Sequence, residues 1–175
     1  MLDPSYIADD IANIPSNYSR IIGRELQLQM RDLPKLLKFT QLSPEQFLQD
    51  DILLTTRQQV QILHNALNLS PHPDFGLRLG RHLTPATHGA MGFLVNSSPN
   101  LLMALQAFQN FVPTRMSFTR LNFKTHQDWV ECEIRFETVL TEEVYRSLLE
   151  CCLMVFVTCA EFIIGRPLYD AQMNF

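Results

Sequence analysis

The sequence predicts one α+β domain that is mostly helical, with several short N-terminal helices, an antiparallel β-hairpin as its small sheet and a long buried C-terminal helix. Three observations support this fold class. Up to Val112, apolar residues recur at every third or fourth position, which is typical of helices that bury one side. From Val130 to Phe136 they alternate with polar residues, which is typical of a strand with one buried face. The segment 148–164 is then almost entirely apolar.

The N-terminal half is expected to be a series of short helices that begin at capping residues. Residues 1–18 show no helical period and are expected to form a lead-in. Residues 19–40 predict a helix in two pieces, because Pro34 interrupts the hydrogen-bond ladder and Asp32 can cap the second piece. Ser43-Pro44-Glu45-Gln46 combines a cap, a first-turn proline and an acid, which start a helix. Further helices are expected over 56–69, 75–83 and 89–96, and from the cap Ser97-Ser98-Pro99 to Val112.

The β-hairpin is expected from two strands and a short turn. Residues 115–123 predict the first strand, with a bulge near Thr119 because the apolar residues change phase there. Residues 124–128 form the turn, and 130–136 form the second strand. The last helix begins at Thr141-Glu142-Glu143, reaches about Ile164 and must be covered on most sides. Residues 170–175 look like the opening of a further strand.

The charge balance argues against nucleic-acid binding by these residues. The net charge is -4 and no basic cluster is present, whereas phosphate binding requires clustered positive charge. The N-terminus lacks the basic region of an export signal. The apolar stretch 148–164 is shorter than the ~20 residues of a membrane-spanning helix and contains Glu150 and Glu161. We therefore expect a soluble cytoplasmic protein with no membrane segment.

Catalytic and metal-binding motifs are missing from the sequence. It has no His-Glu-x-x-His, no Gly-x-Ser-x-Gly and no phosphate-binding glycine loop, and its five histidines are isolated. The four cysteines are expected to be buried, small apolar side chains, and a redox-sensing pair Cys151–Cys152 is the alternative. We therefore predict no enzymatic activity, no metal and no cofactor.

A series of short motifs in the middle of the chain resembles a known family. In order, these are Gly76-Leu77-Arg78-Leu79-Gly80, Thr84-Pro85, Gly89-Ala90-Met91-Gly92, Ser97-Ser98-Pro99-Asn100-Leu101, Ala104-Leu105 and Phe108. Together with the later hairpin and long helix, this order resembles the arabinose-binding-type N-terminal domain of AraC-type transcription regulators. One departure is Asn100, where the family usually has threonine.

The resemblance implies a domain that binds a small effector, dimerises and controls a DNA-binding module. Residues 19–175 would form this domain, truncated at its C-terminus, and contact with DNA would need the helix-turn-helix module that this sequence does not contain. Either the Met91–Leu94 helix or the Leu101–Phe111 helix would provide the dimer face. The alternative is a stand-alone oligomerisation or protein-interaction module that needs no ligand.

The candidate effector site lies between the hairpin and the last helix. A sensor site is concave and largely apolar, with a few polar groups that orient the ligand. Arg115 or Arg146 would bind a carboxylate, so we expect a small organic acid or acyl compound. The aromatic and apolar candidates for its lining, which would otherwise be ordinary core, are Phe118, Trp129, Phe136, Tyr145, Met154 and Phe156.

Overall fold

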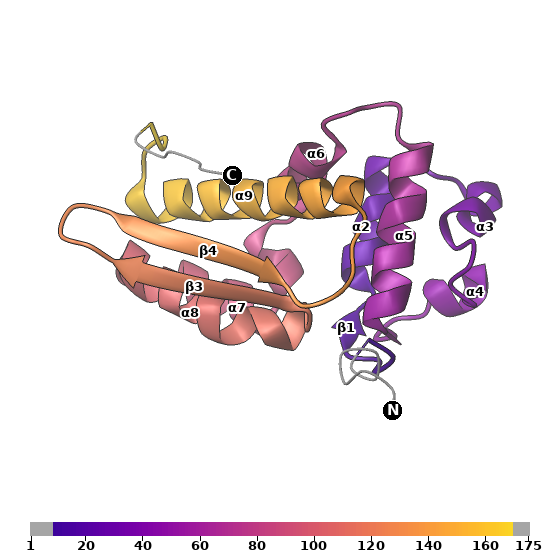
Figure 1. The fold of residues 1–175 in the computed structure, drawn as a ribbon, viewed down its shortest axis with the longest axis horizontal. Coiled ribbons are helices and arrows are strands. Elements are labelled where there is room, and N and C mark those ends of the chain that lie inside the picture. Colours follow the sequence, from indigo (N-terminus) through magenta and orange to yellow (C-terminus); the bar gives the residue numbers. More distant parts are fainter. Residues whose placement is uncertain (1–8, 170–175) are drawn as a thin grey trace.

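The protein has two lobes joined by a long helical contact. The computed structural model describes residues 9–169. In Figure 1, helices α2 to α5 gather at one end, and α7, α8, the hairpin β3–β4 and α9 form the other. Helix α6 (Phe75–His82) runs behind α9 (Glu142–Ile164) and contacts it along its length. The mostly helical α+β fold class is confirmed.

The N-terminal lobe is built on two helices with a small sheet at their base. Its elements are α2 (Asn17–Glu25), α3 (Leu33–Leu36), α4 (Pro44–Phe47) and α5 (Thr56–Leu69), with strands β1 (Ile14–Pro15) and β2 (Leu53–Leu54). The strands pair antiparallel, Ile14 opposite Leu54. Ile14 and Tyr18 are buried, so the C-terminal part of the expected lead-in contributes to this lobe's core.

Capping boxes start the helices of this lobe where the sequence predicts them. The Ser43 hydroxyl accepts from the Gln46 N–H at the start of α4, and the Thr55 hydroxyl accepts from the Gln58 N–H at the start of α5. The predicted division into two pieces is confirmed, since α2 ends at Glu25 and α3 begins at Leu33, with Asp32 at the N-cap position and Pro34 in the first turn. The side chain of Asp32 does not cap α3; it accepts from the Gln29 N–H instead.

The C-terminal lobe packs its helices against one face of the hairpin. It comprises the 3₁₀ helix Pro85–His88, α7 (Ala90–Asn96), α8 (Leu101–Arg115), β3 (Thr119–Thr125), β4 (Val130–Phe136) and α9. β3 and β4 pair antiparallel without interruption from Thr119–Phe136 to Thr125–Val130. The inner face of the hairpin covers α8 and α9, and Figure 1 shows α9 above the strands and α8 below them.

Two predictions at the ends of α8 are wrong. The cap is Asn100, whose side chain accepts from the Met103 N–H, and not Ser97-Ser98-Pro99. The helix continues past Pro113 to Arg115, so β3 begins at Thr119 and not at residue 115. Met116 therefore precedes the strand, which explains the change of apolar phase without any bulge.

Helix α9 is buried along one side and half-exposed along the other. Its buried residues include Leu148, Cys151 and Val155, whereas Tyr145 and Phe162 are exposed. Gly165, in the left-handed conformation, ends the helix as predicted. Residues 170–175, expected to begin another strand, lie outside the described residues.

Glycines allow helices to approach closely at two places. A Cβ atom on Gly80 would lie 2.6 Å from the Met154 Cβ and 2.7 Å from the Cys151 carbonyl oxygen, so α6 touches the backbone of α9. A Cβ atom on Gly92 would overlap the Pro85 carbonyl oxygen. Gly89 instead has φ of 59°, a conformation that favours glycine.

Candidate functional site

A band of buried and half-buried polar side chains lies where the first turn of α2 meets the C-terminal lobe. We call Ser16, Asn17, Tyr18, His88 and Arg115 the polar seam. The Asn17 Nδ2 donates to the Thr87 carbonyl at 2.8 Å, and the Tyr18 Oη lies 3.1 Å from the His88 Nδ1. The Arg115 Nε donates to the Tyr18 Oη at 3.4 Å. The seam thus links α2 to the 3₁₀ helix Pro85–His88 and to the end of α8.

His88 is a neutral imidazole in this seam. Only 5% of its surface is exposed, and burial lowers its pKa from 6.5 to about 4. The positive charge of Arg115 acts in the same direction, and the Leu83 carbonyl opposes it. The Tyr18 hydroxyl accepts from Arg115 and lies within hydrogen-bond distance of the His88 Nδ1, where either group can be the donor. In the tautomer whose Nδ1 accepts from Tyr18, the ring proton lies on Nε2, which has no hydrogen-bond partner among the described residues.

Other polar atoms of the seam are buried without a partner. Ser16 Oγ and Asn17 Oδ1 form no hydrogen bond within the described part of the chain. An unsatisfied buried polar group costs about 1–3 kcal/mol, so such groups normally bond a water or a ligand. Asn96 Oδ1 on α7 and Ser147 Oγ on α9 are in the same state. Three such atoms in the seam therefore mark it as a place for a polar guest.

A row of aromatic rings leads from the seam toward the hairpin. His88 lies 6.4 Å from the Phe108 ring, and Phe108 lies 5.4 Å from Phe156. Phe156 in turn lies 5.8 Å from Phe123 on β3. We call Phe108, Phe156 and Phe123 the aromatic row. Two predicted ligand residues, Arg115 and Phe156, are thereby connected through His88 and Phe108.

The other predicted ligand residues lie in separate places. Phe118, Phe136 and Tyr145 form a second ring cluster, with centroid distances of 6.3 Å and 5.5 Å, at the start of α9. Trp129 is 57% exposed at the hairpin turn, where it stacks on His126 at 3.8 Å.

Two predicted ligand residues on α9 also have other neighbours. Arg146 extends from an exposed position toward Glu150, at 3.8 Å. Met154 lies against Gly80 in the contact with α6.

Sequence reasoning missed Tyr18 and His88. Tyr18 falls in the expected lead-in, and His88 falls in an expected loop as an isolated histidine. The two residues are 70 positions apart in the chain, so no local spacing relates them. The glycine at 89, which follows His88 with positive φ, is the one local signal that the backbone here is specially shaped.

Two hollows lie elsewhere in the described structure. An open groove of about 730 Å³ runs between α5, the segment after α3 and the connection into α9, and includes Lys38, His64, Asn65 and Val139. A smaller hollow of about 200 Å³ includes Glu25 and Arg78. Glu25 is nearly buried and bonds Arg78 and His82 of α6 at 2.5 Å and 2.7 Å. Neither hollow is lined by the predicted ligand residues.

The described residues contain no group of three or more metal-ligating side chains. Burial raises the pKa of Cys152 to about 12 and that of Cys159 to about 11, so both remain thiols at neutral pH. Cys151 and Cys159 are buried as expected, whereas Cys152 is half-buried and the expected burial of Cys132 is wrong, because its strand position is exposed. By length and composition alone, helix α9 could cross a membrane. This is weak evidence for a membrane segment, because the core helix of a soluble protein meets the same criterion.

Comparison with known families decides the class of the domain. The family model described as the arabinose-binding domain of AraC transcription regulators, N-terminal, matches residues 31–175. The chain belongs to this family. It is therefore a ligand-binding regulatory domain of AraC type, as its motifs indicate. The sequence matches no curated protein. The matched range of the AraC-type domain includes His88, Arg115 and the aromatic row, whereas Tyr18 precedes it.

Proposed function

We propose that this AraC-type domain is a cytoplasmic, non-catalytic sensor. It binds a small organic acid or acyl compound, dimerises, and controls a DNA-binding module elsewhere in the full protein. The observation that carries this proposal is the polar seam, a buried polar site beside an arginine and a row of aromatic rings, in a domain of a ligand-binding family.

The effector site extends from the seam along the inner side of the hairpin and α9. Arg115 is the better carboxylate partner of the two predicted arginines, because Arg146 is exposed and already faces Glu150. The apolar part of the effector lies against Phe156. Phe118, Phe136 and Tyr145 form a separate ring cluster, and Trp129 and Met154 have other neighbours, so the proposed site does not include these five residues.

Ligand binding is tested by thermal unfolding against a panel of carboxylic acids, acyl compounds and sugars, L-arabinose among them. A ligand at a hundred times its Kd stabilises the folded state by about 2.7 kcal/mol. For a domain of this size that free energy raises the Tm by about 5–10 °C. If no compound of the panel shifts the Tm, the sensor proposal fails.

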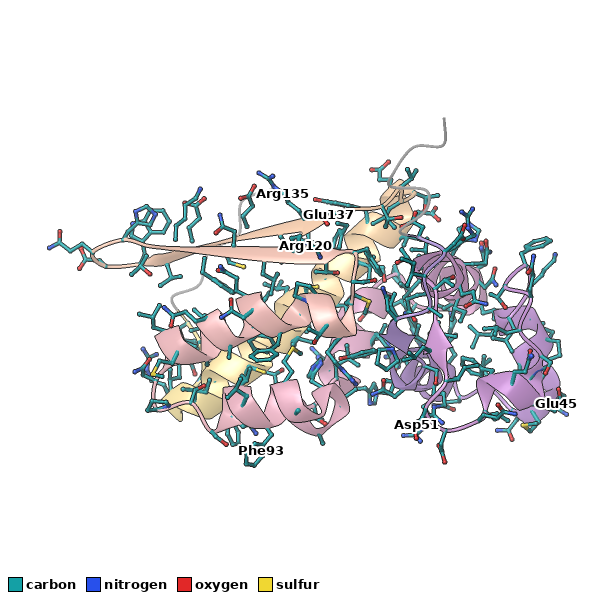
Figure 2. All side chains as sticks on the ribbon, turned by 90° about the horizontal axis from the view of Figure 1, so that it is seen from below. Glu45, Asp51, Phe93, Arg120, Arg135 and Glu137 are labelled. Atoms are coloured by element: carbon teal, nitrogen blue, oxygen red, sulfur yellow. The ribbon has the colours of Figure 1, made fainter. Side chains whose placement is uncertain are left out.

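The outer side of α7 and α8 is the proposed dimer face. Phe93 is 76% exposed and points away from the lobe, as Figure 2 shows. Leu94, Leu102, Met103 and Phe111 on the same two helices are also exposed. Exposed apolar surface of this extent on neighbouring helices is typical of an interaction site.

Sedimentation velocity tests this face. Phe93→Ser should shift the wild-type dimer toward monomer. The matched control is Phe39→Ser, since Phe39 is as exposed but lies in the N-terminal lobe, and this variant should remain dimeric. A dimer with a Kd of about 10 µM is mostly associated at a protein concentration of about 100 µM. A wild-type protein that is monomeric at that concentration would refute dimerisation.

A stand-alone interaction module is the second candidate, and the exposed apolar side of α7 and α8 favours it. A dimer without any ligand response in the thermal panel would support this second function over the first.

A further inference from the structure

We propose that the polar seam recognises a carboxylate that also carries a hydroxyl group, with Arg115 and His88 as donors to the carboxylate and Asn17 as acceptor from the hydroxyl. This inference rests on the proposed function and specifies the effector's polar chemistry. His88 and Asn17 are not among the residues that the sequence suggested.

Arg115 gives the seam a positive charge that no carboxylate of the described residues neutralises. Among the described residues the Arg115 guanidinium bonds only the neutral Tyr18 hydroxyl and forms no ion pair. The nine-residue helix α2 begins in the seam, and the side chain of its N-cap residue Ser16 makes no capping bond. A helix N-terminus carries a partial positive charge and favours anions. Both features select a negatively charged guest.

His88 supplies a buried ring atom, Nε2, that has no hydrogen-bond partner among the described residues. When Nδ1 accepts from the Tyr18 hydroxyl, Nε2 carries the ring proton and can donate it to a guest. Arg115 lies close enough to His88 to disfavour a second positive charge on the ring. An anionic oxygen near both residues would satisfy the His88 donor and neutralise Arg115.

Asn17 requires a hydrogen-bond donor on the guest, whereas Arg115 and His88 require an acceptor. Its Nδ2 is committed to the Thr87 carbonyl, next to His88, and its Oδ1 is buried without a donor. A guest that leaves this oxygen unpaired loses affinity, because the desolvation cost of the amide is not recovered. A hydroxyl group on the carboxylate would supply the missing donor, and Ser16 Oγ offers a further partner for it.

The apolar end of such a guest would meet the aromatic row. Phe108 follows His88 in the row and Phe156 follows Phe108. Aliphatic carbon against these rings contributes affinity in proportion to the apolar area buried. A hydroxy acid of three to six carbons therefore matches the order of groups from Arg115 to Phe156.

The experiment compares matched ligands by isothermal titration calorimetry on the wild-type protein. The probes are 2-hydroxy acids of three to six carbons, the carboxylates that lack the hydroxyl, and the 1,2-diols that lack the carboxylate. At least one hydroxy acid should bind about tenfold or more tightly than both of its matched analogues, since each analogue leaves a buried group unpaired.

Variants locate the site. Arg115→Met should weaken binding of that hydroxy acid by about ten- to a hundredfold, as expected for loss of a hydrogen bond between charged groups, and Arg115→Lys should lose less. The control Arg135→Met removes an arginine from the outer side of the hairpin, labelled in Figure 2, and should leave Kd unchanged. His88→Phe keeps an aromatic ring beside Phe108 but removes the donor, so it should also weaken binding by about tenfold or more, whereas His72→Phe at an exposed turn should not.

The outcomes separate this inference from the proposed function. If hydroxy acids fail to bind but another compound of the thermal panel does, the inference is wrong and the sensor function stands. If hydroxy acids bind with equal Kd in the wild type and in both the Arg115 and His88 variants, the seam is not their site. If only an ordered water occupies the seam and nothing in either set binds, both proposals fail.

Discussion

Replacing Gly80 by alanine tests how closely α6 lies on α9. The added Cβ would come within 2.6 Å of the Met154 Cβ and 2.7 Å of the Cys151 carbonyl oxygen. Carbon atoms in good contact are about 3.5–4.0 Å apart. The two helices would have to separate by roughly 1 Å, and a gap of that size forfeits a quarter to a half of the attraction between facing atoms.

The net effect is a balance of two terms. Overpacking of this kind costs about 1–3 kcal/mol, while alanine in place of glycine inside a helix contributes up to about 1 kcal/mol. Gly80→Ala should therefore destabilise the domain by about 1–2 kcal/mol, which lowers the Tm by about 2–8 °C. The contact cannot relax easily, because a backbone oxygen and a Cβ oppose the new methyl group.

Gly23→Ala is the matched control. Gly23 also lies inside a helix, but a Cβ there would meet nothing closer than the Leu36 Cδ2 at 3.9 Å. This variant should be stabilised by a few tenths to about 1 kcal/mol. Urea denaturation followed by circular dichroism measures both. If Gly80→Ala gains stability as Gly23→Ala does, the close contact of α6 with α9 is wrong.

Two further perturbations probe the seam and α8. Lowering the pH from 6.5 to 4 should destabilise the wild type by up to about 3 kcal/mol more than His88→Phe. Native His88, whose pKa is about 4, takes up a proton only at the end of this range, whereas the same side chain in the unfolded protein takes one up near pH 6.5. Parallel plots of urea midpoint against pH for the two proteins would contradict this. Asn100→Ala should cost about 1 kcal/mol, because the side-chain cap of α8 is lost, and Ser97→Ala should leave the urea midpoint unchanged. An equal loss of stability in Asn100→Ala and Ser97→Ala would instead indicate that Ser97 caps the helix.

The elements with strong local signals were predictable from the sequence. Helix α5 occupies Thr56–Leu69 and strand β4 occupies Val130–Phe136, as their periodicity predicts. Helix α9 runs from Glu142 to Ile164, because a threonine cap and two acids mark its start and Gly165 follows its end. Each of these signals acts within one or two turns of the chain, so no tertiary information was needed.

Features that depend on contacts between distant residues were not predictable. The two-residue strands β1 and β2 are too short to show any alternation. Helix α8 was expected to end at Val112, but it continues through Pro113 and carries Arg115 to the seam. For the candidate site, composition identified Arg115 and the aromatic residues, whereas the Tyr18–His88 hydrogen bond is a product of folding alone.

The ion pairs of Glu25 connect helix α2 to the close contact between α6 and α9 at Gly80. Glu25 at the end of α2 holds Arg78 and His82 of α6, and α6 rests on the backbone of α9 at Gly80. Side-chain rotamers can absorb a small displacement between helices, but a contact made by backbone atoms cannot. The side-chain ion pairs of Glu25 therefore absorb part of any tilt of α2, whereas a displacement of α6 is passed directly to α9.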